Sequence, residues 1–292
     1  MSSNRIRTPI STAFAGAAAC FLSIYAATDL AADETDASVA AATGSSEGDD
    51  NVGYSDDTYR NLIEKYSVDD GDSVDYAAWQ ASDADMRALD EFIRAIGRVS
   101  PDNHPELFAT ESLARRYWIN AYNALVLDSV LDYWPLDSVR DVKVSVSSRI
   151  VSGKGFFYDR EFLVGGKTIN LLDLEEQVLE SLDDPRLHFA LNCASDSCPV
   201  LRASDWSEQE LDRAARDFIN DPENVAIEDG RLYLSRIFKW YRKDFPRDIV
   251  GYLLDYADAP LAADLETAAN DDYPIRYRDY DWSLNASGDE AH

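Results

Sequence analysis

The chain has 292 residues, of which 46% are hydrophobic, a composition that excludes disorder throughout and is sufficient for a sizeable core. Its formal net charge of −28 disfavours a nucleic-acid partner, because a phosphate backbone would be repelled. A surface this acidic is typical of halophilic adaptation, in which dense carboxylates keep a protein hydrated in a salty medium.

The N-terminal segment has the features of an export signal. Arg5 and Arg7 precede a mostly apolar run over residues 10–27, and the first acidic residue is Asp29. This order predicts a signal peptide over residues 1–32 and therefore an exported protein, periplasmic or extracellular. Lipid attachment at Cys20, or an uncleaved signal that tethers the protein to a membrane, stays open as an alternative.

The next segment, residues 33–56, is acidic and almost without large apolar side chains, which predicts a flexible tether. We expect one folded domain over residues 57–285 and a tail over residues 286–292. No later segment approaches the roughly 20 apolar residues that a membrane-spanning helix needs. Membrane contact is therefore expected only through the N-terminal signal, and only if that signal stays uncleaved.

Helical periodicity dominates the first half of this domain. Apolar residues recur at helical spacing over residues 86–96, and residues 111–133 form a longer predicted helix that is apolar over most of its circumference. We expect the second helix at the centre of the core. Asn120 and Asn123 lie inside it, one turn apart, and their amides must be hydrogen-bonded there, either as clips to a neighbouring loop or as site residues.

Short β-strands are predicted after Gly155. The pattern indicates strands over residues 156–158, 162–164 and 168–169, with a Gly165-Gly166 turn between the last two.

The remaining pattern alternates helices with short β-segments. Asn170 is predicted to cap a helix, and residues 186–191 to form a short buried strand. Ser207 begins a capping box, Asp229-Gly230 marks a hairpin, and residues 237–256 are helical in pattern. Because no βαβ rhythm appears, the sequence predicts an α+β fold, with one domain of long helices packed against short antiparallel strands and hairpins.

The segment RLHFALNCASDSCP, residues 186–199, contains Cys193 and Cys198 together with His188. In an exported protein the spacing of the two cysteines fits a disulfide. Alternatively, Cys193 is a nucleophile, which requires a base to generate the thiolate. A metal held by His188 and both cysteines is a third interpretation, but the spacing is unusual for zinc and no fourth ligand is evident. We therefore predict no metal and no cofactor, and leave disulfide and nucleophile as open alternatives.

The nucleophile interpretation assigns roles to the neighbouring polar residues. His188 would be the base and Glu175 the carboxylate that orients it. The amides of Asn120, Asn123 and Asn192 are candidates for substrate binding, with Asn120 or Asn192 as a donor to an oxyanion.

Six segments together resemble the DUF547 family, a domain family of unknown function. They are RYWINAYNALVL (116–127), GFF (155–157), VGGKTINLLDLEE (164–176), DPRLHFALNCASDSCPVL (184–201), FKWYRKDF (238–245) and YRDYDWSLN (277–285). The resemblance covers most of the chain between residues 59 and 285 and implies an α+β domain without implying a reaction. The positions that match the family pattern are Asn120, Asn123, Gly155, Glu175, His188, Asn192, Cys193, Cys198 and Pro199. Similar sequences tend to have His after the helix glutamate, where this chain has Glu176, and this departure weighs most against a metal site.

Two functions follow as hypotheses. The first is an exported hydrolase or acyl-transfer enzyme centred on the Cys193 thiol. The second is a non-enzymatic cell-envelope binding module, stapled by a Cys193–Cys198 disulfide, whose partner is a small molecule, a peptide or an envelope component. An enzyme should place His188, Cys193 and Glu175 at one pocket.

Overall fold

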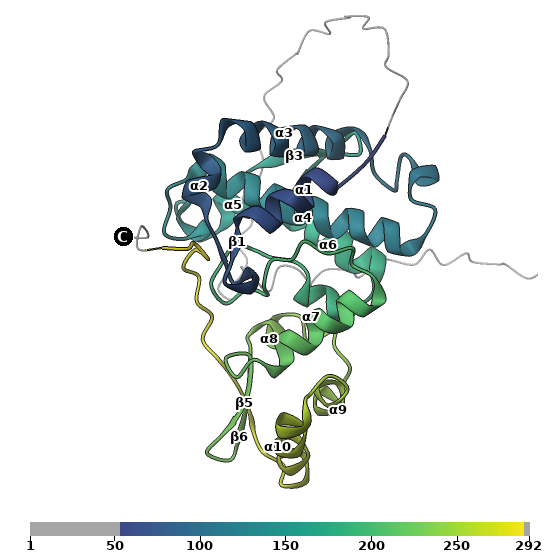
Figure 1. Cartoon of the computed structure of the whole chain (residues 1–292). Helices are drawn as coiled ribbons and strands as arrows, with labels where there is room; N and C mark the ends of the chain where they lie inside the picture. The colour runs from purple at the N-terminus through teal and green to yellow at the C-terminus, as the bar shows by residue number, and fades with distance from the viewer. Residues whose placement is uncertain (1–52, 289–292) are drawn as a thin grey trace, which may run out of the picture.

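The structure is a computed structural model and describes residues 53–288 (Figure 1). The predicted signal peptide and most of the predicted tether therefore lie outside the described residues. The helices are α1 (Asp57–Tyr66), α2 (Tyr76–Gln80), α3 (Asp83–Arg98), α4 (Glu111–Tyr133), α5 (Lys154–Phe157), α6 (Leu171–Leu182), α7 (Glu208–Asn220), α8 (Ile237–Trp240), α9 (Ile249–Leu254) and α10 (Ala259–Asn270). Short 3₁₀ turns are η2 (Asp69–Gly71), η3 (Pro105–Leu107), η4 (Val139–Asp141) and η5 (Pro185–Phe189).

The strands form three small sheets. They are β1 (Ser67–Val68), β2 (Ser73–Val74), β3 (Glu161–Val164), β4 (Lys167–Asn170), β5 (Val225–Glu228), β6 (Arg231–Leu234) and β7 (Ile275–Tyr277). The pairs β1–β2, β3–β4 and β5–β6 are antiparallel, whereas β7 adds to β6 in parallel. Helices with small sheets confirm the predicted α+β class.

The chain forms a broad part that contains α1 to α6 and a narrower part that contains α7 to α10 and the β5–β6 hairpin (Figure 1). After β7, the C-terminal segment runs back from the narrow part to the broad one. There Leu284 pairs with Ser195, and Ala286 pairs with Val74. Within this returning segment, residues 280–285 lie against residues 193–198, the cysteine turn described below.

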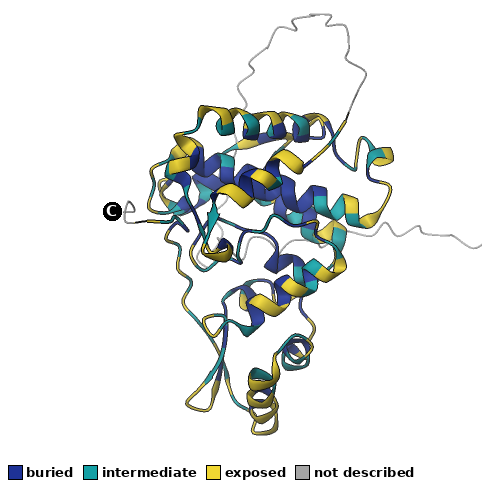
Figure 2. Ribbon diagram, in the orientation of Figure 1, coloured by how far each residue is buried: buried dark blue, intermediate teal, exposed yellow. Residues whose placement is uncertain are grey.

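Helix α4 lies at the centre of the core, as predicted. The hydroxyl of Thr110 accepts a hydrogen bond from the backbone N–H of Leu113 at 3.2 Å and thereby caps the first turn. Almost every residue from Tyr117 to Leu131 is buried, including both asparagines (Figure 2). The charged residues of α3 and α7 face solvent instead, so these helices form the outer faces.

The Gly165-Gly166 turn is confirmed and joins β3 to β4. Both glycines have positive φ angles, 55° and 79°, which a residue without a Cβ adopts at no steric cost. The N–H groups of Gly165 and Gly166 donate to the carbonyls of Ile96 and Gly97 at 2.9 and 2.8 Å. These bonds fix the hairpin to the C-terminal end of α3.

Two predicted strands are wrong. Residues 154–157 form the short helix α5 instead of part of a strand over residues 156–158, and Phe156 and Phe157 are both buried. A Cβ at Gly155 would lie 2.2 Å from the carbonyl oxygen of Val142, so the glycine lets this turn approach the preceding loop.

Residues 185–189 form the 3₁₀ turn η5 and not the predicted buried strand over residues 186–191. Pro185 occupies the first turn, and the Asp184 carboxylate accepts from the N–H of Arg186 at 2.9 Å, which together start a helical turn. The four consecutive residues from Leu187 to Ala190 are all buried, a pattern that a one-sided strand does not give.

The helical pattern over residues 237–256 is interrupted. Helices α8 and α9 are separated by residues 241–248, which include Pro246, and the Asp248 side chain caps α9 by accepting from the N–H of Gly251 at 3.0 Å. Ser207 is the N-cap residue of α7, but its side chain makes no capping hydrogen bond.

The last residues of the predicted tether pack against the domain. The Tyr54 ring lies 5.2 Å from that of Tyr117, and Asp56 is fully buried beside Arg116 and Asn120. Acidic composition alone did not reveal these contacts.

Candidate functional site

The two cysteines lie on a tight turn that begins at Asn192. Ala194, directly after Cys193, has a φ of 60°, a left-handed conformation that costs a non-glycine residue on the order of 1 kcal/mol. The side-chain oxygen of Asn192 accepts from the N–H of Ala194 at 2.8 Å and supports this conformation. The chain then turns at Ser195, whose carbonyl accepts from the N–H of Cys198 at 2.9 Å.

The cysteine turn is fixed to α4 by an exchange of amide hydrogen bonds. Asn123 accepts from the N–H of Asn192 at 2.9 Å and donates to the carbonyl of Ala190, also at 2.9 Å. Asn192 in turn donates to the carbonyl of Pro199 at 2.7 Å. Both amides therefore act as clips that set the position of Cys193.

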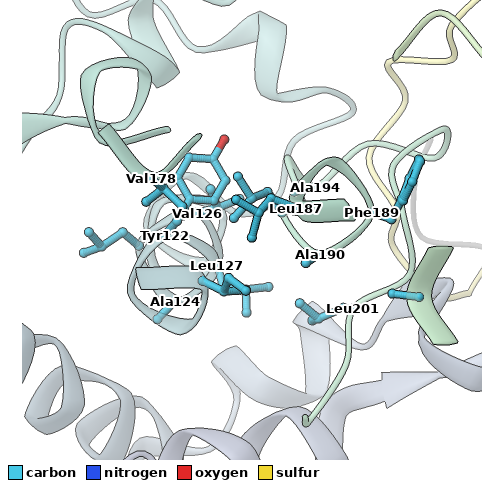
Figure 3. Close-up of a cluster of buried hydrophobic side chains, with 14 of the residues drawn as sticks. Tyr122, Ala124, Val126, Leu127, Val178, Leu187, Phe189, Ala190, Ala194 and Leu201 are labelled. Carbon is cyan, nitrogen blue, oxygen red and sulfur yellow. The ribbon is translucent and has the colours of Figure 1, made fainter. Parts of the chain in front are cut away.

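The apolar side of the turn is part of the core. Figure 3 shows Leu187, Ala190 and Ala194 beside Val126 and Leu127 of α4. All five side chains are at most 2% exposed. Because buried packing and hydrogen bonds act together, the backbone around Cys193 is held from both sides.

Cys193 and Cys198 form a disulfide. The pairing confirms one of the two interpretations left open by the sequence. In this state Cys193 carries no thiol, so a nucleophilic role requires prior reduction of the bond.

Hydroxyl groups surround the two sulfur atoms. The Tyr280 hydroxyl lies 3.3 Å from the Cys193 sulfur and 3.2 Å from the Cys198 sulfur. The Ser195 hydroxyl lies 3.2 Å from the Cys193 sulfur and donates to Tyr280 at 3.0 Å. Tyr280 belongs to the returning C-terminal segment, so that segment covers the disulfide.

A small cavity of about 40 Å³ adjoins the disulfide. On a scale where one water occupies roughly 10–15 Å³, the cavity holds about three waters, so it admits only the end of a larger molecule. His188, Glu175 and Cys193 all contribute to its wall. The other lining residues are Tyr122, Phe157, Leu191, Cys198, Pro199, Ile237, Trp240, Tyr241, Tyr280 and Trp282. The three residues that sequence analysis assigned to a thiol site thus share one cavity.

Glu175 on α6 is buried and accepts hydrogen bonds from two tyrosines. Its Oε2 accepts from the hydroxyl of Tyr122 at 2.8 Å, and its Oε1 accepts from the hydroxyl of Tyr241. Burial raises the pKa of the Glu175 carboxyl, and the two tyrosine hydroxyls and His188 oppose that rise. The carboxyl therefore has an environment suited to holding or releasing a proton.

His188 is bonded to a different carboxylate from the one expected. Its Nε2 lies 2.9 Å from Oδ2 of Asp244, and its ring lies 4.1 Å from that of Tyr241. Nδ1 is consequently the ring nitrogen that Asp244 does not engage. Sequence analysis had given the orienting role to Glu175 and overlooked Asp244, which lies 56 residues further along the chain. The only hint in the sequence was its place in the FKWYRKDF segment.

Asn120 lies in a separate buried network. It donates to Asp56 at 2.7 Å and accepts from the indole N–H of Trp206 at 2.9 Å. None of Asn120, Asn123 and Asn192 is among the residues that line the small cavity. Their role in substrate binding remains a prediction.

A larger cleft of about 970 Å³ also adjoins the disulfide and shares Cys198, Pro199 and Tyr280 with the small cavity. Its carboxylates are Asp72, Asp196, Asp217, Asp221, Glu223, Glu228, Asp279 and Asp281. Burial raises the pKa of both Asp72 and Asp196, and neighbouring carboxylates add to the rise. Such a lining would repel a phosphate backbone, and no nucleic-acid partner is indicated.

Neither a metal centre nor a membrane span is visible between residues 53 and 288. No group of three or more His, Cys, Asp or Glu side chains in that range is arranged to hold a metal ion. No helix there has the length and apolar character needed to cross a bilayer.

The fold and site define an α+β domain in which a disulfide-bonded cysteine pair borders both an acidic cleft and an aromatic cavity. A family model described as "Protein of unknown function, DUF547" matches residues 109–219, the segment from α4 through α7 that holds Glu175, His188 and both cysteines. This match supports the assignment of the chain to the DUF547 family. Neither the curated proteins nor the solved structures that were searched include a match to it.

Proposed function

We propose that the protein is a thiol-dependent acyl-transfer or hydrolytic enzyme whose nucleophile is Cys193. The observation that carries the proposal is that Cys193, His188 and Glu175 line one cavity although they come from different parts of the fold. A buried carboxyl, a histidine bonded to an aspartate and a sulfur atom in one small space are the groups that acyl transfer needs.

The disulfide represents the resting state in this proposal. An external dithiol supplies two electrons, becomes a disulfide itself and leaves Cys193 and Cys198 as thiols. His188 then takes the proton of the Cys193 thiol through Nδ1, while Asp244 holds the ring through Nε2. The Tyr280 hydroxyl, already within hydrogen-bond distance of the Cys193 sulfur, would stabilise the thiolate.

The chemical step forms and breaks one bond to the acyl carbon. The Cys193 thiolate attacks the carbonyl carbon of an acyl donor, and the leaving group departs with the proton from His188. The resulting thioester is attacked by water in a hydrolase, or by an amine or alcohol in a transferase, and the thiol returns. The small cavity limits the group that enters beside the sulfur to a few atoms.

The experiment is acylation by p-nitrophenyl acetate, followed by mass spectrometry of the Cys193 peptide. The Cys198→Ser variant frees Cys193 without a reductant, so we expect an acetyl group on Cys193 in this variant and in the reduced wild-type protein. Cys193→Ser is the control for attachment elsewhere. Absence of acetyl-Cys193 from a folded Cys198→Ser protein would contradict the proposal.

A second candidate function rests on the disulfide itself. A disulfide between two cysteines five residues apart is the cross-link expected of a binding module that is stabilised by a structural staple. In that case the Cys193→Ala/Cys198→Ala variant should keep the protein's binding to its envelope or peptide partner, and the acylation experiment should give no product.

Both candidates assume an oxidising compartment, and we propose that the protein is exported. Disulfides persist mainly outside the cytosol, and the N-terminal sequence has the order of a signal peptide. The mass of the protein recovered from its native host tests this proposal, because cleavage near residue 32 would remove the N-terminal segment.

A further inference from the structure

One surface loop differs from the acidic remainder of the chain because it exposes aliphatic side chains. The loop between η4 and α5, residues 142–153, exposes three aliphatic side chains within seven residues: Val144 at 51%, Val146 at 77% and Ile150 at 71%. Among the large hydrophobic residues of the described chain, Val146 and Ile150 have the greatest exposed fractions. Exposed aliphatic side chains that cluster in one short loop indicate a contact surface.

The exposure does not come from a lack of local structure. The side chain of Ser148 accepts from the N–H of Ser145 at 2.8 Å and donates to the carbonyl of Ser145 at 2.8 Å. The N–H groups of Ile150 and Val151 both donate to the carbonyl of Ser147, at 3.0 and 2.9 Å. The serine side chains thus close a turn that points the aliphatic residues outward.

The charge of the loop is opposite to that of the protein. Residues 142–158 contain Lys143, Arg149 and Lys154 but no Asp or Glu, in a chain with 55 acidic and 27 basic residues. Lys154 is paired with Asp159, so Lys143 and Arg149 carry the charge that is exposed in this loop. Aliphatic side chains flanked by exposed cations are the combination that enters the interface of an anionic bilayer.

We infer that residues 143–150 form a membrane-contact loop that inserts Val144, Val146 and Ile150 into the surface of an anionic lipid bilayer. Lys143 and Arg149 would lie at the level of the lipid headgroups, where their attraction to the anionic lipids acts within a Debye length. Salt screens the repulsion between those lipids and the acidic remainder of the protein, which lies further away. The inference is independent of the chemistry proposed for Cys193.

Hydrogen exchange of the loop amides in the full chain tests the inference, because a readout confined to the loop is separate from retention by the N-terminal segment. The protein is measured alone, with vesicles of phosphatidylglycerol and with vesicles of phosphatidylcholine. We expect slower exchange over residues 143–150 with phosphatidylglycerol and little change with phosphatidylcholine.

Two variants sharpen the test. Val146→Asp/Ile150→Asp should abolish the protection and weaken binding by tenfold or more, since each lost aliphatic contact changes partitioning by roughly that factor. Leu163→Asp, which changes another half-exposed aliphatic residue on β3, is the matched control and should retain the protection.

Three results would overturn the inference. They are unchanged exchange in the loop with phosphatidylglycerol, equal protection by both lipids, and protection that rises with protein concentration in the absence of vesicles. The last result would assign the loop to contacts between copies of the chain.

Discussion

Nε2 of His188 lies 2.9 Å from Oδ2 of Asp244, and the same imidazole ring packs against Tyr241, whose hydroxyl donates to Glu175. The histidine is therefore held between an exposed carboxylate and a buried one through two different kinds of contact. If His188 is the base, Asp244 fixes which ring nitrogen carries the proton. Glu175 then acts on His188 only through Tyr241 and through the electric field of its own carboxylate.

We expect Asp244→Asn to slow acylation of the reduced protein by roughly 100-fold, because the amide does not stabilise the imidazolium that forms. The rate should be measured against pH, since a merely structural role would leave the shape of the pH profile unchanged. Asp255→Asn, which changes another exposed carboxylate, is the control. Wild-type rates and profile in Asp244→Asn would remove Asp244 from the site.

The sequence revealed the central helix, the hairpins and the cysteine pair, because each depends on local periodicity or on turn residues. It did not reveal η5, because the residues of this turn are also compatible with a β-strand. The helical turn forms there because Pro185 occupies its first position and the Asp184 side chain caps it. Nor did it reveal Asp244 or Tyr280, since these reach the site through the path of the chain after α7. Contacts that depend on tertiary topology leave no periodic signal.

The disulfide should stabilise the fold modestly. It closes a short loop, with a sequence separation of 5, so loss of the cross-link should lower the free energy of unfolding by about 2 kcal/mol. Urea unfolding of Cys193→Ala/Cys198→Ala against the oxidised wild-type protein measures the difference. A loss well above 4 kcal/mol would mean that the bond is needed to hold the turn itself.

The buried ion pair of Asp56 with Arg116 should contribute more to the stability of the fold than the exposed side chain of Asp57. Asp56 is fully buried and paired with Arg116 and Asn120, so Asp56→Asn should cost about 3 kcal/mol by leaving the guanidinium poorly compensated. Asp57, next in sequence, has a side chain 77% exposed, and Asp57→Asn should change stability by less than about 0.5 kcal/mol. Equal effects in chemical denaturation would show that residues 53–56 do not anchor the domain.

Asp128 should make stability depend on pH. Burial raises the pKa of its carboxyl to about 6, and Arg160, 2.8 Å away, offsets only part of the rise. Because an unfolded Asp has a pKa of about 3.9, the folded state binds the proton more tightly, and ionisation destabilises the fold as pH rises from about 4 to 6. Because the Asp128 side chain is partly exposed, solvent screening keeps the net effect at about 1–2 kcal/mol.

Asp128→Asn removes this ionisation. Its stability relative to the wild-type protein should therefore be similar near pH 4, increase up to about pH 6 and remain constant above it. Urea unfolding of both proteins across this range provides the comparison. A difference that is the same at every pH would show that Asp128 does not titrate as its burial implies.

The reactivity of Cys193 after reduction tests the proposed function most directly. The full chain is reduced, freed of reductant and treated with iodoacetamide near neutral pH, and the rate of alkylation is followed separately on the Cys193 and Cys198 peptides. Activation by His188 predicts that Cys193 reacts at least about tenfold faster than Cys198 and that His188→Ala removes the difference. Equal, slow alkylation of both thiols, unchanged in His188→Ala, would contradict a nucleophilic Cys193 and favour the disulfide as a structural staple.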